Sequence, residues 1–301
     1  MKSSSKIFLV IFAVPVLASI LLNFIYDKPP TDHGKGTMFD LIANRYDFTN
    51  RILALNMDIG WRKRMIAEVT LNGQLFHGIN DESSVKVLDL ATGTADVAIL
   101  FAKEYLNANV DTSTKRDLEI LGVDPSINMI TVGREKISKE NLGKQITLDL
   151  GDARNLKELE NNFFDAATMS FGIRNVPEKE QALCEIHRVL KKENINGNGG
   201  QTGAKFGILE FSEPAEDSGV MGAGAKFFIR YVVPVLGAIL SGAPRDYMHL
   251  QNSIKEFPSP KEFAALMEGL SCGEDGGGSF RVDELIQMNF GSVQLYLATP
   301  I

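Results

Sequence analysis

The sequence predicts an α/β protein with a mostly parallel central sheet that helices cover on both faces. Three observations lead to this prediction. A chain of 301 residues is long enough for one large α/β domain. Between residues 85 and 211, short apolar runs alternate with amphipathic segments of helical spacing. Aspartates accompany three of these runs, at the strand ends where open α/β sheets bind ligands.

The composition argues against three classes of protein: nucleic-acid binders, metalloproteins and disulfide scaffolds. A formal net charge of -7 argues against a nucleic-acid binder, which normally carries a basic face. The 4 histidines and 2 cysteines are scattered, so we expect no metal site and no disulfide scaffold. Cys184 lies on the apolar side of an expected helix and is interpreted as a core thiol, whereas Cys272 lies in a glycine-rich loop.

The N-terminus differs in character from the rest of the chain. Residues 7–25 form an uncharged apolar run that follows two lysines. A bilayer-spanning helix needs about 20 such residues. We therefore interpret residues 1–30 as a hydrophobic anchor or targeting segment with the start of a linker, and residues 31–301 as the folded domain. A buried helix is the alternative.

Two amphipathic helices are expected over residues 38–69, with Gly60 between them. The expected strands that follow are residues 85–91, 118–123, 146–150, 164–170 and 206–211. The expected helices are residues 97–106, 126–138 and 177–191.

Three later segments have a distinct composition. The glycine-rich stretches 194–204 and 273–279 are expected to form surface loops. Residues 223–240 are apolar, but Arg230 and Pro234 interrupt them. We predict a helical cover over the active site there, rather than a second membrane span.

The stretch VLDLATGTADVA, residues 87–98, is expected to form a strand, a glycine turn and the start of a helix. This arrangement brings backbone N–H groups and a helix N-terminus up to a ligand. Asp124 ends the next strand, where a carboxylate can accept both hydroxyls of a ribose. Asp152 and Ala153 follow the third strand and could contact the edge of an adenine.

Two nucleotide-type cofactors suit that edge. A dinucleotide requires G-x-G-x-x-G, which Gly93, Ala95 and Ala98 match poorly. S-adenosylmethionine (SAM) carries no phosphate. It needs a turn, an acid for the ribose and acceptors around a cationic methionine, which Asp89 and Asp124 suit better. The alternative is that these aspartates only cap turns and helices.

From residue 38 to about residue 253, the chain resembles the ubiquinone/menaquinone biosynthesis C-methyltransferases. The motifs that carry the resemblance are FDLIANRYDFTNRILALNMDIGWRKR, DLATGTADVA, GVDPSINMI, SFGIRNV, EFSEP and YMHLQNSIKEFP, in the order of that family. The resemblance implies a Rossmann-like class I SAM-methyltransferase fold with a mostly parallel seven-stranded sheet and helical lid segments near residues 38–70 and 221–270. It also implies an enzyme that methylates a ring carbon of a polyprenylated benzoquinol or naphthoquinol.

Carried over residue by residue, the resemblance assigns the contacts of the cofactor. It places SAM beside the turn at Gly93 and against Thr94, Asp124, Asp152, Ala153 and Ser170. Ala95 departs from the pattern, because the family usually has glycine there. An alanine is strained wherever φ is positive.

The same resemblance implies catalytic roles for Arg174 and Asn175, two polar residues among the apolar ones of SFGIRNV. A quinol ring carbon becomes nucleophilic when the neighbouring hydroxyl loses its proton, and an arginine can stabilise the resulting phenolate. Asn175 can orient a ring oxygen, and Tyr46 is a third candidate catalytic group. The alternatives are a structural salt bridge for Arg174 and lid packing for Tyr46.

A polyprenylated substrate implies contact with lipid. We expect membrane association, at a mitochondrial inner membrane or in a plastid, with a bacterial-type membrane as the open alternative. We also expect either a homodimer or a quinone-biosynthesis complex. Two other functions stay open from the sequence. One is a catalytically impaired methyltransferase-like subunit, suggested by Ala95, and the other is an NAD-dependent oxidoreductase, disfavoured by the missing glycines.

Overall fold

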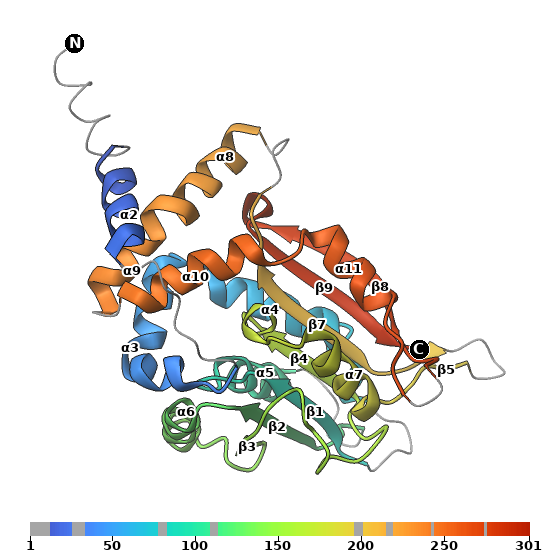
Figure 1. The fold of residues 1–301 in the computed structure, drawn as a ribbon. Helices are drawn as coiled ribbons and strands as arrows, with labels where there is room; N and C mark the ends of the chain where they lie inside the picture. Colours follow the sequence, from blue (N-terminus) through green and yellow to red (C-terminus); the bar gives the residue numbers. More distant parts are fainter. Residues whose placement is uncertain are drawn as a thin grey trace.

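A seven-stranded sheet forms the centre of the computed structural model (Figure 1), in the order β3-β2-β1-β4-β7-β9-β8. The structure describes residues 13–25, 34–77, 83–108, 114–195, 201–214, 219–241, 244–273 and 276–301. The strands are β1 (Val85–Leu90), β2 (Leu118–Asp124), β3 (Ile146–Leu150), β4 (Ala166–Ser170), β7 (Lys205–Phe211), β8 (Phe280–Met288) and β9 (Val293–Pro300). The first five are parallel, and β9 pairs antiparallel with both β7 and β8.

The five strands expected from apolar runs are confirmed. Strands β8 and β9 were not among those expected from apolar runs. β8 lies at the edge of the sheet and mixes exposed charged residues with half-buried apolar ones, whereas β9 is buried along its whole length. The stretch 194–204, expected to be a loop, carries a short antiparallel pair, β5 (Asn194–Ile195) and β6 (Gln201–Thr202).

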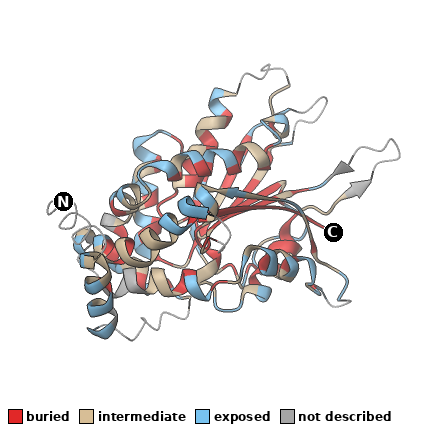
Figure 2. Cartoon of the chain, turned by 90° about the horizontal axis from the view of Figure 1, so that it is seen from above, coloured by how far each residue is buried: buried red, intermediate tan, exposed pale blue. Residues whose placement is uncertain are grey.

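Helices cover both faces of the sheet, as predicted, and Figure 2 shows its strands as the most buried part of the molecule. One face packs on α4 (Met57–Val69), α5 (Asp96–Asn107) and α6 (Ile127–Lys139). The other packs on α7 (Lys179–Val189) and α11 (Pro260–Glu268). Gly60 lies inside α4; the break before α4 falls instead at Leu55 and Asn56, which have positive φ of 51° and 60°.

A separate group of helices lies at one end of the sheet (Figure 1). It contains α2 (Val14–Ile25), α3 (Thr37–Leu53), α8 (Gly219–Phe227), α9 (Val233–Ser241) and α10 (Pro244–Glu256). Between α8 and α9 the helix takes one wide π-turn, Phe228–Val232. Pro234 lies two residues after the end of that turn, so the carbonyl four residues before it belongs to Arg230 within the turn. Because proline has no N–H and crowds the carbonyl four residues earlier, a wider turn accommodates it without ending the helix.

Residues Gly219–Leu240 form one helical stretch that is long and apolar enough to cross a membrane, by length and composition alone. Its residues Met221, Phe228 and Val233 line an internal cavity, which agrees with the predicted helical cover. Of the apolar run 7–25, the structure describes residues 13–25. There Ser19 is buried and donates to the Arg230 carbonyl, while Phe24 is 85% exposed. Helix α2 therefore packs against the other helices at this end of the sheet and is not part of the hydrophobic core.

The prediction of an unpaired core thiol at Cys184 is wrong. Cys184 on α7 and Cys272, in the segment between α11 and β8, form a disulfide. The two residues are 88 positions apart, so their spacing gave no local signal. They meet because α7 and α11 pack side by side on the same face of the sheet, where Cys272 is 5% exposed.

Removing the disulfide should lower stability. In the Cys184→Ala/Cys272→Ala variant, we expect a loss on the order of 3 kcal/mol in the free energy of unfolding, because the crosslink restricts a long loop in the unfolded chain. Urea unfolding with and without reductant checks this. The chain has only these 2 cysteines, so reductant should affect the parent protein and leave the variant unchanged. A parent protein with two titratable thiols in its folded state would contradict the pairing.

Candidate active site

The loop between β1 and α5 forms one wall of the site. Its residues Ala91, Gly93 and Ala95 all have positive φ, of 49°, 56° and 66°. At Gly93 an added Cβ would meet nothing within 4 Å, because the residue faces an open cavity. The Gly93 N–H donates to Asp124 Oδ2 at 2.9 Å, which ties this loop to the end of β2.

Asp124 is the acid that the sequence placed at the end of β2. Its second oxygen, Oδ1, accepts the N–H of Ser126 at 2.9 Å, and the residue is 7% exposed. Burial raises the pKa of the Asp124 carboxyl to about 6, although both backbone hydrogen bonds act in the opposite direction. The carboxylate is thus desolvated at the edge of a cavity, where a ligand that donates hydrogen bonds would stabilise its ionised form.

A cavity of about 370 Å³, here called the strand-end cavity, opens at this edge. Of the residues predicted to bind the cofactor, it is lined by Gly93, Asp124, Asp152, Ala153 and Ser170. The Ser170 hydroxyl is buried and has no hydrogen-bond partner within the described residues. A buried polar atom without a partner is costly, so this hydroxyl suits a ligand atom in the cavity.

Asp152 is held from one side by an arginine that the sequence analysis did not single out. Arg154 donates to both carboxylate oxygens of Asp152, from Nε at 3.0 Å and from Nη2 to Oδ2 at 2.6 Å. Arg154 also pairs with Glu178 across the cavity rim. These contacts keep the pKa of Asp152 below its usual range against the effect of burial.

Two predicted cofactor residues do not line either cavity. Asp89 is 1% exposed and accepts hydrogen bonds from the hydroxyls of Thr92, at 2.6 Å, and Thr168, at 2.7 Å. Burial raises its pKa to about 6. The Thr94 hydroxyl donates to Asp47 at 2.6 Å, away from the cavity. Both side chains therefore hold the loop in place, and the loop lines the strand-end cavity with Ala91 and Gly93 instead.

Ala95 is fully buried in the left-handed region, with φ of 66°, so the strain expected there is present. Its methyl group faces Gly133 of α6, and the residue does not line the strand-end cavity. The alanine thus adds strain to the loop without occupying the space of a ligand.

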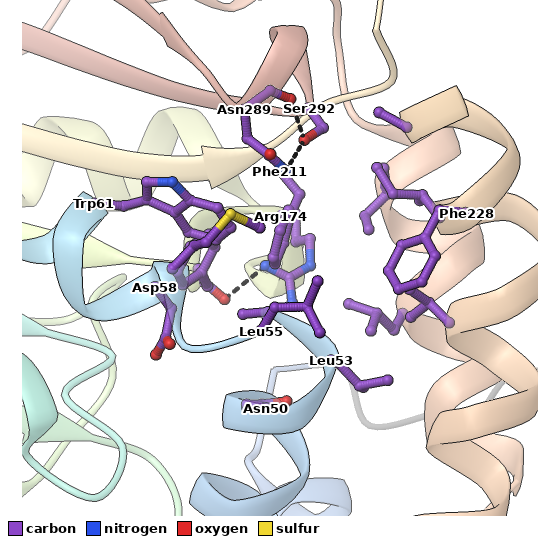
Figure 3. A pocket seen from close by; sticks show the side chains of 18 of the residues that line it. Asn50, Leu53, Leu55, Asp58, Trp61, Arg174, Phe211, Phe228, Asn289 and Ser292 are labelled. Atoms are coloured by element: carbon purple, nitrogen blue, oxygen red, sulfur yellow. Dashed lines mark hydrogen bonds between the residues drawn. The ribbon is translucent and has the colours of Figure 1, made fainter. Parts of the chain in front are cut away.

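A second cavity, of about 450 Å³ and here called the apolar cavity, adjoins the first. Figure 3 shows Trp61 on one side of it and Phe228 on the other, with Phe211, Arg174 and Leu55 between them. Its apolar wall also contains Met38, Ile42, Leu53, Val220, Met221, Ile229, Val233 and Phe290. Seven residues line both cavities: Met38, Phe39, Tyr46, Phe171, Arg174, Asn175 and His249.

The motif SFGIRNV forms the boundary between the two cavities. Phe171 turns the chain at the end of β4 with φ of 58° and stacks on Phe211, with ring centroids 4.4 Å apart. Gly172 must be small, because a Cβ there would lie 2.5 Å from that of Ala91. A short helical turn, Ile173–Asn175, then presents Arg174 and Asn175 to the cavities.

Arg174 makes the buried salt bridge that the sequence analysis left open as an alternative. Its Nη1 donates to Glu210 Oε1 at 2.5 Å and to the Phe171 carbonyl at 2.8 Å. The Arg174 side chain is 7% exposed and that of Glu210 is 0% exposed. The Nε–H of Arg174 is buried without a partner in the described part of the chain. The guanidinium therefore neutralises the buried Glu210 carboxylate, and its Nε–H is a hydrogen-bond donor without a partner at the boundary between the cavities.

Tyr46 and Asn175 also lie at the boundary, and a histidine joins them. His249 on α10 lies with its Nε2 3.2 Å from Asn175 Oδ1. Tyr46 comes from α3, and burial raises the pKa of its hydroxyl. The sequence analysis treated the histidines as scattered, because 74 residues separate His249 from Asn175.

Comparison with known proteins identifies the family. Residues 31–274 match the model of the ubiE/COQ5 methyltransferase family. The chain belongs to this family. It is therefore a SAM-dependent methyltransferase, and its sheet is that of the Rossmann-like class I SAM-methyltransferase fold.

Curated relatives agree with this assignment. The ubiquinone/menaquinone biosynthesis C-methyltransferase UbiE of Citrifermentans bemidjiense is 36% identical over 230 residues, covering 76% of this chain and 84% of the relative. The protein of the same name from Geotalea uraniireducens is 33% identical over 233 residues, covering 77% and 85%. The demethylmenaquinone methyltransferase of Deinococcus radiodurans is 34% identical over 241 residues, covering 80% and 86%.

The residues of the strand-end cavity fit SAM. Asp124 offers acceptors for ribose hydroxyls, the unpartnered Ser170 hydroxyl offers a donor, and Gly93 leaves room for close approach. Asp152 and Ala153 line the same cavity.

Proposed function

We propose that this enzyme transfers the methyl group of SAM to a ring carbon of a polyprenylated quinol in ubiquinone or menaquinone biosynthesis. The observation that carries the proposal is the pair of adjoining cavities. One is lined by polar strand-end residues and the other is lined mainly by apolar side chains, and they meet at Arg174 and Asn175. A quinol head group at that boundary would have its ring next to the methyl donor and its prenyl tail in the apolar cavity.

Bound SAM supplies an electrophilic methyl group, and the chain's own residues do the rest. The stacked rings of Phe171 and Phe211, with Trp61 edge-on to both, form an aromatic wall that can hold a quinol ring and exclude water. The buried Arg174 Nε–H can donate to a quinol oxygen as negative charge develops there. The amide of Asn175 can orient the same head group.

A methyltransferase-like subunit without turnover was the strongest alternative from the sequence, on account of Ala95. The position of Ala95 argues against that alternative, because its methyl group faces α6 and leaves the strand-end cavity open. Strain at one residue in the left-handed region costs about 1–2 kcal/mol, which lowers stability without blocking the site.

Turnover tests the proposal directly. Purified protein should methylate a short-chain demethylated quinol, kept reduced, with SAM as donor, and mass spectrometry should find one added methyl group on a ring carbon. Parallel assays with a benzoquinol and a naphthoquinol identify the head group. Binding of S-adenosylhomocysteine without turnover of either quinol would favour the inactive-subunit alternative.

The proposal includes membrane association through the helices at the end of the sheet. Phe24 of α2, Val220 of α8 and Ile239 of α9 are 85%, 88% and 72% exposed. Val220 also lines the apolar cavity, so exposed apolar surface continues into the space proposed for the tail. Within the predicted anchor segment 1–30, helix α2 lies in this group of helices and would add apolar surface for the membrane. The curated relatives named above are bacterial and give no support for a mitochondrial or plastid location.

Vesicle flotation tests this association. The full chain should float with phosphatidylcholine vesicles, and a variant that lacks residues 1–30 and carries Val220→Ser and Ile239→Ser should stay in solution. The truncated chain with an unaltered helix should bind partially, because a shallow apolar surface remains. Failure of the full chain to float would overturn membrane association while leaving the methyltransferase assignment intact.

A further inference from the structure

Methylation of a quinol carbon requires a group that takes up a proton. The reacting ring carbon gains its nucleophilic electron density only when the neighbouring hydroxyl loses its proton. Arg174 cannot take it, since a guanidinium in a protein stays protonated. Tyr46 is no better, because a neutral phenol has no proton-accepting role near neutral pH and burial raises its pKa.

Three carboxylates near the cavities are poor candidates for taking up this proton, because they form ion pairs or lie away from the boundary. Asp58 lines the apolar cavity but pairs with both Arg51 and Arg62. Glu210 pairs with Arg174 and does not line either cavity. Glu256 lines only the strand-end cavity and is exposed.

His249 lines both cavities. Three titratable residues line both cavities within the described chain, and of Tyr46, Arg174 and His249 only the histidine can take up a proton near neutral pH. It comes from α10, which places it at the boundary opposite the SFGIRNV turn. Its Nε2 lies 3.2 Å from Asn175 Oδ1, and because an amide oxygen only accepts, Nε2 carries the proton in this arrangement. In the neutral ring, Nδ1 then holds the lone pair.

We propose that His249 is the catalytic proton acceptor of this methyltransferase, held in place by Asn175; the inference rests on the proposed function. The quinol O–H bond breaks, its proton goes to the imidazole, and its electron pair delocalises onto the ring carbon. The electron pair on the ring carbon forms the new carbon–carbon bond to the methyl group as the methyl–sulfur bond breaks, and the bonding pair of that methyl–sulfur bond stays on sulfur. The methylated carbon then loses its ring proton to water, and His249 returns its proton to the oxygen. One proton is released overall.

The hydrogen bond to Asn175 assigns a second role to the pair. With Oδ1 turned to His249, the Asn175 amide nitrogen is left to donate to a substrate oxygen. His249 thus removes a proton while Asn175 binds the head group. Because the two side chains are hydrogen-bonded, the base is held next to the bound quinol.

Two substitutions distinguish a base from a residue that only positions Asn175. His249→Gln keeps an N–H donor for Asn175 but cannot take up the proton, so we expect kcat to fall by ~10²-fold or more, with KM for the quinol and the affinity for S-adenosylhomocysteine within a few-fold. In His249→Ala, added imidazole should restore part of the lost turnover. Imidazole should leave the parent enzyme and the His249→Gln variant unchanged.

Lys255→Ala is the matched control, because Lys255 is exposed on the same helix and lines neither cavity. It should keep the turnover of the parent enzyme. Parent-like kcat in His249→Gln, or no imidazole rescue of a folded His249→Ala variant, would overturn the role of His249 as base. Absence of methylation by the parent enzyme would instead overturn the proposed function itself.

Discussion

Replacing Arg174 by methionine should lower both turnover and stability, for two separable reasons. The substitution removes a donor at the boundary of the two cavities, and the loss of one preorganised charge stabiliser typically costs ~10²–10³ in kcat. It also leaves Glu210, whose side chain is 0% exposed, without its cation. Breaking one side of a buried ion pair costs about 3–5 kcal/mol in the free energy of unfolding.

The double variant Arg174→Met/Glu210→Gln separates the two effects. A neutral glutamine removes the uncompensated charge and can still accept the Phe211 N–H that Glu210 Oε1 accepts at 2.8 Å. We expect most of the stability to return while kcat stays low. Urea unfolding, S-adenosylhomocysteine calorimetry and turnover of a demethylated quinol measure the three quantities. If turnover returned together with stability, Arg174 would have a structural role only.

Neutralising Asp124 should weaken cofactor binding more than any other single change in the strand-end cavity. Asp124→Asn removes charge-assisted acceptors for the ribose, a loss on the order of 2–4 kcal/mol in the free energy of binding. Asp149→Asn on the neighbouring strand is the matched control, because Asp149 is exposed and does not line either cavity. Calorimetry with S-adenosylhomocysteine at neutral pH compares the three proteins. Parent-like affinity of Asp124→Asn would remove this residue from the site.

The pH dependence of that affinity follows from the raised pKa of Asp124, about 6 in the ligand-free protein. The ribose hydroxyls favour the carboxylate, so affinity should be full above pH 6 and fall as the group takes up a proton, by about tenfold at pH 5. The free energy of unfolding of the ligand-free protein should change with pH in the opposite direction. It should fall as pH rises from about 4 to about 6, since a buried carboxyl must ionise. Asp124→Asn should flatten the binding curve. If the affinity of this variant still depended on pH, the dependence would come from other groups, such as Asp89, whose pKa is also about 6.

Local patterns predicted the centre of the fold and one edge of the site. Strands β1 to β4 and β7 followed from apolar runs, because a strand buried on both faces needs apolar residues at consecutive positions. The carboxyl ends of parallel strands share one edge of a sheet, so Asp124 and Asp152 were expected to come together, and both line the strand-end cavity. Ser170, which only the family resemblance had implied, lines the same cavity. The edge strand β8 gave no such pattern, since much of it is in contact with solvent.

The sequence by itself determined the parallel sheet, the family and the strand-end residues, all of which depend on neighbouring positions in the chain. Only the tertiary structure decided which distant residues meet: Cys184 with Cys272, Arg174 with Glu210, and His249 with Asn175. It also turned Asp89 and Thr94 away from the cavity, toward partners that hold the loop. The physical reason is that periodicity is set by successive residues, whereas the partner of a buried charge or thiol is set by how helices pack across a sheet, which no short stretch of sequence encodes.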